Sequence, residues 1–362
     1  MSPSPGAFPP RREADPSPRL VGLAERFAGL RIAVIGDVIA DEFLYGRPAR
    51  VSREAPVLIL EHDRTAVVPG GAGNAAANAG ALGGEVRLVG LVGPGERELL
   101  DGLRASVDVS RVLRPEGYRA PVKTRVLAGG RHTARQQIVR VDRRSVGDAE
   151  AAAADFGQAA LGAVDGCDAV LCSDYGSGLV TPALFARLRD HLAPGGGRPP
   201  IPMLVDSRHN LAAFRGCTAC TPNEAEAEQA LGGPIGDDPA RLERAGRELL
   251  ERTGAGGVVL TRGSRGMAVF VPGRETDHIG IFGSDEVADV TGAGDTVIAA
   301  LSLALAAGAS LYEAARLANY AGGLVVMKRG TATVTGAELI RAIRADRASD
   351  RADRASDWGE ER

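Results

Sequence analysis

Apolar and polar positions follow two alternating patterns along this chain. Short, nearly continuous apolar runs are typical of strands buried on both faces of a sheet, and they occur at 31–36, 86–93, 168–174, 201–207, 217–222 and 257–263. Longer stretches with helical spacing occur at 72–84, 149–164, 181–193, 239–254, 294–307 and 311–327. The alternation predicts one α/β domain, with a doubly wound, mostly parallel sheet and helices on both faces.

Two segments do not follow this rhythm. Residues 50–71 and 119–142 alternate polar and β-branched positions, and the second contains a Gly-Gly turn. They predict β-ribbons near 45–66 and 119–142. Because ligands of α/β proteins bind at the carboxyl ends of the strands, we expect the ribbons to form a small lid over such a site.

The two ends of the chain have a different composition. Residues 1–20 hold six prolines and no apolar segment of the kind that a secretory signal needs, so we expect a disordered leader and a cytoplasmic protein. The hexapeptide ADRASD occurs twice within 345–357 and has no apolar stripe, which predicts either a solvated helix or a disordered tail over 345–362. The folded domain is expected to span 21–344.

Charge and composition exclude several classes of function. The chain of 362 residues has 43 basic and 46 acidic residues and only 4% aromatics, which argues against a nucleic-acid partner. No apolar run approaches the roughly 20 residues of a membrane helix. The pair Cys217 and Cys220 has zinc-ligand spacing, but no second pair completes a ligand set, so we expect the four cysteines to be buried thiols.

The strongest chemical signal is the segment 289-DVTGAGDTV-297, where glycines precede an apolar helix. Such a helix start exposes unpaired backbone N–H groups and lets an anion approach closely. Asp295 in the first turn either complements the helix dipole or accepts a proton from a hydroxyl beside a bound phosphoryl group. The combination fits phosphoryl transfer, which needs positioning, charge neutralisation and a base.

Polar residues also follow most of the predicted strands. Each is a common turn former when taken alone, but a series at corresponding strand ends predicts a binding cleft; the series is Asp37, Asp174, Asp206, Asn223, Glu226, Thr261 and Gly263. The glycine cluster 70-GGAGNAAAN-78 lacks the Lys-Ser/Thr ending of a P-loop. We expect Gly70 and Gly71 to bring backbone N–H groups to a polyol, with Asn74 adding hydrogen bonds.

These segments carry a family resemblance. The stretches 69-PGGAGNAAAN-78 and 289-DVTGAGDTV-297 resemble the two signatures of the ribokinase-like (PfkB-type) sugar kinases, and the resemblance covers about 31–340. It implies an ATP- and Mg²⁺-dependent kinase in which Asp295 is the base and the N–H groups of Gly292, Ala293 and Gly294 hold the transferred phosphoryl group.

The resemblance also implies the nucleotide and cation sites. The residues matching the nucleotide-binding positions are Asn223, Glu226, Thr261, Gly263, Gly266 and Asn319. Glu226 would help to organise Mg²⁺, and Asp289 would help a nearby cation site. A monovalent cation such as K⁺ is expected near 328–331.

Within the family, the stretches 36–57, 123–127 with 136–142, and 171–178 resemble the members that phosphorylate the anomeric hydroxyl of D-glycero-D-manno-heptose 7-phosphate. This resemblance implies that Asp37 binds sugar hydroxyls and that lid cations bind the substrate's phosphate; with their neighbours, the substrate-binding residues would be Asp37, Gly70, Gly71, Asn74, Arg53, Lys123, Arg125, Gln137, Arg140 and Asp174. Ser177 and Arg208 stand where many relatives have lysine, so a kinase for another sugar or sugar phosphate remains an alternative.

Two further alternatives concern activity and assembly. A non-catalytic sugar- or nucleotide-binding module would keep the fold, although the retained Asp295 and glycines favour catalysis. A second, adenylylating activity is not expected, because no nucleotidyltransferase motif follows Glu338. The ribbon edges could pair two copies, which predicts a homodimer.

Overall fold

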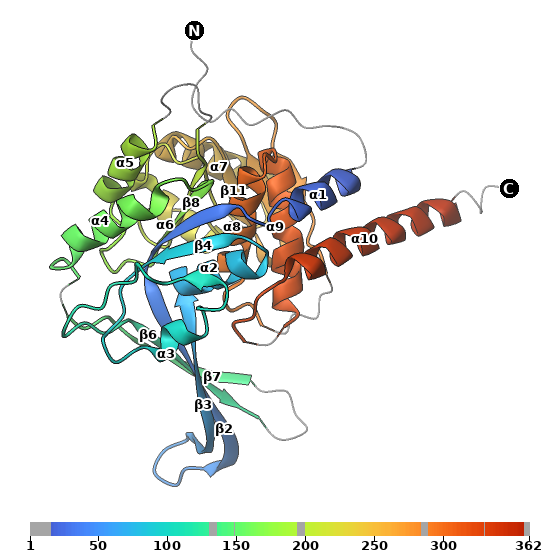
Figure 1. Cartoon of the computed structure of the whole chain (residues 1–362). Coiled ribbons are helices and arrows are strands. Elements are labelled where there is room, and N and C mark those ends of the chain that lie inside the picture. Colours follow the sequence, from blue (N-terminus) through green and yellow to red (C-terminus); the bar gives the residue numbers. More distant parts are fainter. Residues whose placement is uncertain are drawn as a thin grey trace.

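A nine-stranded sheet forms the centre of the molecule (Figure 1), and the computed structural model describes residues 16–129, 136–147, 149–193, 200–283, 289–328 and 330–357. The order across the sheet is β13-β12-β11-β10-β9-β8-β1-β4-β5. The bounds are β1 Arg31–Gly36, β4 Glu85–Val89, β5 Val107–Asp108, β8 Ala169–Asp174, β9 Met203–Ser207, β10 Ala219–Cys220, β11 Val258–Thr261, β12 Met267–Phe270 and β13 Asp277–Ile279. Pairing is parallel from β11 to β5, and β12 and β13 pair antiparallel at one edge.

Helices cover both faces of this sheet, as the alternation of patterns predicts. One face carries α1 (Pro16–Glu25), α2 (Ala72–Ala81), α8 (Ala293–Ala306), α9 (Leu311–Val326) and the start of α10 (Gly336–Asp357). The other carries α4 (Ala153–Val164), α5 (Pro182–His191), α6 (Glu224–Leu231) and α7 (Pro239–Thr253). A short α3 (Glu98–Asp101) and the 3₁₀ turns η1 (Leu211–Ala213) and η2 (Gly263–Arg265) complete the chain.

Strand β1 shows why its apolar run is continuous. Ile32 and Val34 belong to the apolar cluster on one face, whereas Ala33 and Ile35 belong to the cluster on the other, and all four have no exposed surface. Successive side chains of a strand point to opposite faces, so a strand covered on both sides needs apolar residues at every position. The predicted doubly wound α/β class is confirmed.

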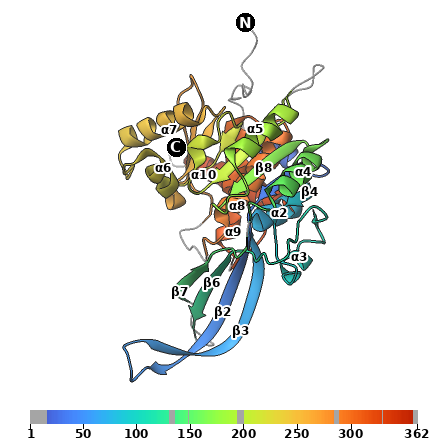
Figure 2. The same ribbon diagram turned by 90° about the vertical axis from the view of Figure 1, so that its left-hand side faces the viewer.

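The two predicted ribbons form one four-stranded sheet that projects from the body (Figures 1 and 2). Its order is β3-β2-β6-β7, with bounds β2 Val38–Val51, β3 Leu58–Gly71, β6 Val122–Ala128 and β7 Gln136–Arg143. The hairpin β2–β3 pairs from Val38↔Gly71 to Val51↔Leu58, and β2 pairs parallel with β6. The sequence predicted the ribbons but not this parallel pairing, which joins segments about 80 positions apart.

The N-terminal end of the folded domain differs from the sequence prediction, and the C-terminal end follows one of two predicted alternatives. Helix α1 begins at Pro16, inside the segment expected to be a disordered leader, and Leu20 and Leu23 are fully buried. Proline is tolerated in the first helical turn, so the two prolines at 16 and 18 do not prevent the helix. At the other end, α10 continues to Asp357, so the charged repeat follows the first of the two predicted alternatives, a helix, up to that residue.

The cysteines lie in the core. Cys167, Cys172, Cys217 and Cys220 are free, buried thiols within the same apolar cluster. Among the described residues, no helix combines the length and the apolar character that crossing a bilayer requires.

Candidate active site

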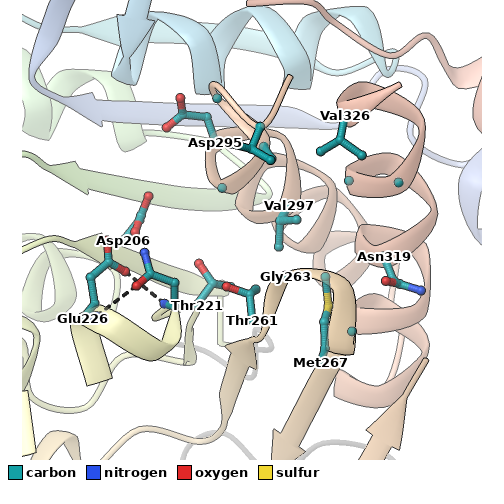
Figure 3. A pocket seen from close by; sticks show the side chains of 18 of the residues that line it. Asp206, Thr221, Glu226, Thr261, Gly263, Met267, Asp295, Val297, Asn319 and Val326 are labelled. Atoms are coloured by element: carbon teal, nitrogen blue, oxygen red, sulfur yellow. Dashed lines mark hydrogen bonds between the residues drawn. The ribbon is translucent and has the colours of Figure 1, made fainter. Parts of the chain in front are cut away.

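A cavity of about 390 Å³ lies at the carboxyl ends of the central strands, between the strand exits and helices α8 and α9 (Figure 3). All six residues predicted to bind nucleotide line it: Asn223, Glu226, Thr261, Gly263, Gly266 and Asn319. So do Gly292, Ala293, Gly294 and Asp295. Apolar walls come from Met267, Ile281, Val290, Val297 and Val326. The cavity therefore combines an apolar wall with a helix N-terminus and a carboxylate, a combination that suits a ligand with both an apolar and an anionic part.

The N-terminus of α8 is built by glycine. Gly292 is the N-cap in the left-handed conformation, with φ 76°, and no side chain caps the helix. A Cβ added to Gly292 would lie 2.3 Å from the Asn74 Nδ2 atom, so the position is closed to other residues by both backbone and space. Of the three predicted anion-binding amides, that of Ala293 already donates to the Val290 carbonyl at 3.2 Å.

Asp295 is held at both of its carboxylate oxygens. Asn74 Nδ2 donates to Oδ2 at 2.7 Å, and the Tyr175 hydroxyl donates to Oδ1 at 2.8 Å. The residue is 4% exposed, and burial raises its pKa to about 6, although both hydrogen bonds act in the opposite direction. A carboxylate with such a pKa is ionised near neutrality and still able to take a proton.

Tyr175 is the important residue that the sequence analysis missed. It follows β8, its hydroxyl contacts Asp295, and two cations lie over its ring, with Lys123 Nζ 4.6 Å and Arg208 Cζ 4.5 Å from the ring centroid. Lys123 belongs to β6 of the lid, and Arg208 lines the cavity. The segment 171–178 was singled out for its resemblance and for Asp174 and Ser177, and an uncharged phenol gave no separate signal.

Asn74 makes contacts with the protein that the sequence did not predict. Its amide N–H groups reach Asp295 and the Gly292 carbonyl, and its Oδ1 accepts from Asn78 Nδ2 at 3.1 Å. The side chain is 2% exposed. These contacts orient the Asp295 carboxylate, and the predicted hydrogen bonds from Asn74 to a polyol stay a prediction.

Asp37 and Asp174 are also engaged by the protein. Asp37 Oδ2 accepts from the N–H groups of Tyr175 at 2.8 Å and Ser177 at 3.2 Å, while its Oδ1 accepts from the Ser177 hydroxyl. Asp174 accepts from Gly176 N at 2.9 Å and the Ser207 hydroxyl at 2.7 Å. Burial raises the pKa of Asp37. The two aspartates thus hold the loop that carries Tyr175, and their predicted contact with substrate stays a prediction.

The two glycines at the end of β3 are required by packing. A Cβ on Gly70 would lie 2.4 Å from Asp41 Oδ2, and one on Gly71, at φ 57°, would lie 2.5 Å from the Asp37 carbonyl oxygen. Asp41 was not singled out by the sequence analysis. It forms a buried ion pair with Arg125, with 2.6 Å between Asp41 Oδ1 and Arg125 Nη1. Arg125, which was predicted to bind the substrate's phosphate, therefore already has an anionic partner.

The other predicted lid residues lie at different distances from the cavity. Lys123 is near Tyr175, and desolvation followed by repulsion from Arg208 lowers its pKa to about 8. Arg140 pairs with Asp142 at 2.8 Å on the exposed strand β7, where Gln137 is also exposed. Arg53 occupies the turn of the β2–β3 hairpin.

That turn is remote from the cavity of its own chain. At about 3.3 Å per residue, the strand from Val38 to Val51 spans on the order of 40 Å. Arg53 therefore lies far along the hairpin from the cavity of its own chain, and its predicted role in substrate binding stays a prediction.

The predicted cation-binding residues are placed as follows. Asn223 and Glu226 form a reciprocal capping box at the start of α6, which uses one Glu226 oxygen and leaves the other available. Asp289 accepts from Thr291 N at 2.9 Å and Gly330 N at 3.1 Å. Within the described ranges, no three His, Cys, Asp or Glu side chains gather closely enough to hold a metal ion.

Asp206 adds a third acid to the cavity, beside Glu226 and Asp295. Burial raises its pKa to about 8, and the nearby charges of Glu226 and Asp295 act in the same direction. The cavity thus carries acidic groups that repel one another and that a bound cation would stabilise, beside amides that favour an anion.

A glycine-capped helix N-terminus, a buried carboxylate with a raised pKa and a lidded α/β sheet together define a small-molecule phosphotransferase with a ribokinase-like fold. A family model for the pfkB family carbohydrate kinases matches residues 30–337. The chain belongs to this family, and it is a sugar kinase.

Curated relatives and solved structures agree with that assignment. The chain is 41% identical over 329 residues to "Bifunctional protein HldE" of Trichlorobacter lovleyi, covering 89% of this chain and 64% of the relative. It is 40% identical over 324 residues to the protein of the same name from Geobacter sulfurreducens, covering 86% and 62%. The chain thus spans less than two thirds of the length of these relatives.

Two solved structures share the fold. The Arabidopsis thaliana ribokinase complexed with ribose and ATP has a TM-score of 0.66 at 17% identity, covering 87% of this chain and 99% of the ribokinase. Phosphofructokinase-2 from Escherichia coli in complex with fructose-6-phosphate has a TM-score of 0.65 at 18% identity, covering 88% and 99%.

Proposed function

We propose that this sugar kinase transfers the γ-phosphoryl group of ATP to the anomeric hydroxyl of D-glycero-D-manno-heptose 7-phosphate, giving the 1,7-bisphosphate. The observation that carries the proposal is the single cavity in which the expected nucleotide-binding residues, the α8 N-terminus and Asp295 meet. The choice of heptose rests on the resemblance of 36–57, 123–127 with 136–142, and 171–178 to kinases of that sugar.

The proposed reaction follows from the geometry around Asp295. The anomeric oxygen attacks the γ-phosphorus, a new O–P bond forms, and the bond from phosphorus to the β–γ bridging oxygen breaks, with ADP as the leaving group. Asp295 takes the proton of the attacking hydroxyl, and the amides of Gly292 and Gly294 stabilise charge on the transferred group. Asn74 and Tyr175 hold the carboxylate in one orientation for this step.

ATP would lie along the cavity with its purine against the apolar wall and its phosphates toward α8. Mg²⁺ is generally bound by one or two carboxylates together with phosphate oxygens, and Glu226 and Asp206 are the carboxylates that fit it here. When bound, Mg²⁺ neutralises phosphate charge. For a monovalent cation, Asp289 and the Thr331 hydroxyl are candidate oxygen ligands. The Thr331 Oγ1 atom is buried and has no hydrogen-bond partner among the described residues.

The sugar phosphate would lie between Asp295 and the lid. Lys123 is the lid cation whose position beside Tyr175 suits the terminal phosphate, and phosphate binding would favour its charged form. Arg140 is a second candidate, because its exposed ion pair with Asp142 contributes little stability and can be exchanged for a phosphate contact.

We also propose that two copies pair through the lid sheets. Strand β7 is exposed along its whole length, and Ile138, Val139 and Val141 are each nearly half exposed. Pairing would cover these side chains, and it would give Arg53 a way to act at the cavity of the second copy. Sedimentation equilibrium of the wild-type protein and of Val139→Glu tests this arrangement, with a monomeric wild-type protein as the opposing result.

A substrate panel tests the proposed function. Purified protein is given ATP, Mg²⁺ and, in turn, heptose 7-phosphate, unphosphorylated heptose, fructose 6-phosphate and ribose, and ADP release is followed. We expect kcat/KM to be highest for heptose 7-phosphate. Good turnover of a hexose or pentose substrate without turnover of heptose 7-phosphate would favour the alternative of a kinase for another sugar.

Two variants test the assigned roles. Lys123→Met should raise KM at least about 10-fold for heptose 7-phosphate but not for unphosphorylated heptose, because only the former carries the phosphate. Asp295→Asn should lower kcat by at least about 10²-fold. Unchanged turnover in Asp295→Asn rejects the base, and absence of ATP consumption by the wild-type protein with every sugar favours a binding module.

A further inference from the structure

Tyr175 contacts the Asp295 carboxylate on α8, Lys123 of the lid and Arg208, which lines the cavity. Its hydroxyl lies 2.8 Å from Asp295 Oδ1, and its ring lies beneath the ammonium group of Lys123 and the guanidinium group of Arg208. These partners come from three separate elements: α8, β6 and the exit of β9. No other described side chain makes such a set of contacts with Asp295.

We propose that Tyr175 is a positioning residue for the phosphoryl-transfer step, which aims the Asp295 carboxylate at the sugar hydroxyl and links that carboxylate to the closed position of the lid. The inference rests on the proposed function, in which Asp295 is the base. It adds a residue without a proton-transfer role of its own.

The hydroxyl is suited to this task as a permanent donor. Burial, followed by the charges of Asp295 and Asp206, raises the pKa of Tyr175 well above its ordinary value, so the phenol keeps its proton. A phenol that stays protonated can only donate to Asp295, and with Asn74 on the second oxygen the carboxylate plane is fixed by two bonds. Fixing the base before the reaction removes a reorganisation that the transition state would otherwise require.

The ring is suited to sense the lid. Cations over an aromatic face are attracted by its quadrupole, so the position of Lys123 favours a single placement of the Tyr175 ring. The backbone of Tyr175 is held from below by the bond from its N–H to Asp37 Oδ2 at 2.8 Å. Movement of β6 away from the body would withdraw the cation and release the ring, and with it one of the two bonds to Asp295.

The charged groups around Asp295 determine what the loss of the phenol should do. Asp41 raises the pKa of Asp295, while Arg208 and the two hydrogen bonds lower it. Tyr175→Phe keeps the ring for both cations and deletes only the hydroxyl. The acid limb of the kcat profile, expected near pH 6 in the wild-type protein, should then move upward by about one pH unit.

The experiment compares Tyr175→Phe with Tyr320→Phe, by steady-state kinetics from pH 5 to 9. Tyr320 is a matched control, because it is also buried and its hydroxyl also donates to a carboxylate, that of Asp346 at 2.5 Å, away from Asp295. We expect Tyr175→Phe to lower kcat about 10-fold with KM for ATP unchanged and the acid limb raised. Tyr320→Phe should keep the wild-type kcat and the wild-type position of the acid limb in the pH profile.

The inference is overturned if Tyr175→Phe lowers kcat without displacing the acid limb of its pH profile. A wild-type pH profile of kcat for Tyr175→Phe overturns it as well. Full turnover by Asp295→Asn instead overturns the proposed base, so the two failures are distinguishable. Should Tyr175→Phe fail to fold, a fluorinated tyrosine at the same position keeps the shape and strengthens the donor. Its acid limb should move downward, and an unmoved limb again overturns the inference.

Discussion

Replacing Gly292 at the start of α8 tests how the Asp295 carboxylate is held. Gly292→Ala places a Cβ where the Asn74 Nδ2 atom now lies, 2.3 Å away, in a residue with φ 76°. The Asn74 amide has to turn aside, and its 2.7 Å bond to Asp295 is lost. The variant should therefore lose both stability and activity, for two separable reasons.

The magnitudes follow from the two effects. A left-handed conformation costs an alanine about 1–2 kcal/mol relative to glycine. Displacing a buried amide from its partner adds about 1–3 kcal/mol. Gly308→Ala supplies the control, since Gly308 has φ 83° but no atom within 4 Å of an added Cβ, and it should show only the first cost.

Activity separates the two variants more clearly than stability does. We expect kcat of Gly292→Ala to fall about 10²-fold, because a misdirected base and a crowded helix N-terminus both act on the transferring group. Gly308→Ala should keep the wild-type kcat. ADP release under saturating ATP and sugar phosphate, with urea unfolding of each variant, measures both quantities. Equal kcat values for the two variants would refute the argument that Asn74 must stay in place.

Three other outcomes are expected. The wild-type kcat should fall about tenfold per pH unit below pH 6, because the base must be deprotonated and its pKa is about 6. The same raised pKa means that burying the charged Asp295 destabilises the fold above pH 6, so Asp295→Asn should gain up to about 3 kcal/mol at pH 8, and calorimetry should find the gain lost toward pH 4. Arg125→Ala leaves Asp41 charged and buried and should cost about 3–5 kcal/mol in urea unfolding. Arg140→Ala, which breaks an exposed pair, should cost less than about 1 kcal/mol, and similar losses for both arginines would contradict the burial argument.

Local patterns were sufficient to predict most of the fold. The strand at 31–36 and the helices on either side follow from periodicity, because burial on two faces and on one face leave different spacings of apolar residues. The pairing of β2 with β6 was not predictable in this way, since it depends on contacts between distant segments. The helix beginning at Pro16 was missed because the proline-rich composition outweighed the apolar positions of Leu20 and Leu23.

The site was predictable to the extent that its residues carry charge or need glycine. Asp295, Gly292 and the nucleotide-binding positions at the strand exits lie together around one cavity. The partners of Asp295 were not predictable in the same way. Asn74 and Tyr175 lie 221 and 120 positions away in sequence, and nothing local in either segment records that they converge on one carboxylate.

The junction between β1 and β2, where the lid sheet joins the body, affects how substrate can enter. Strand β2 begins at Val38, two positions after β1 ends, and Asp37 between them holds the Tyr175 loop. Because four hydrogen-bonded strands form the lid, we expect its opening to be a rotation of the whole sheet about this junction rather than the movement of a single loop. Entry of sugar and loosening of the Tyr175 loop would then be one event, which would leave the carboxylate fully aligned only after the sheet has closed on the bound sugar.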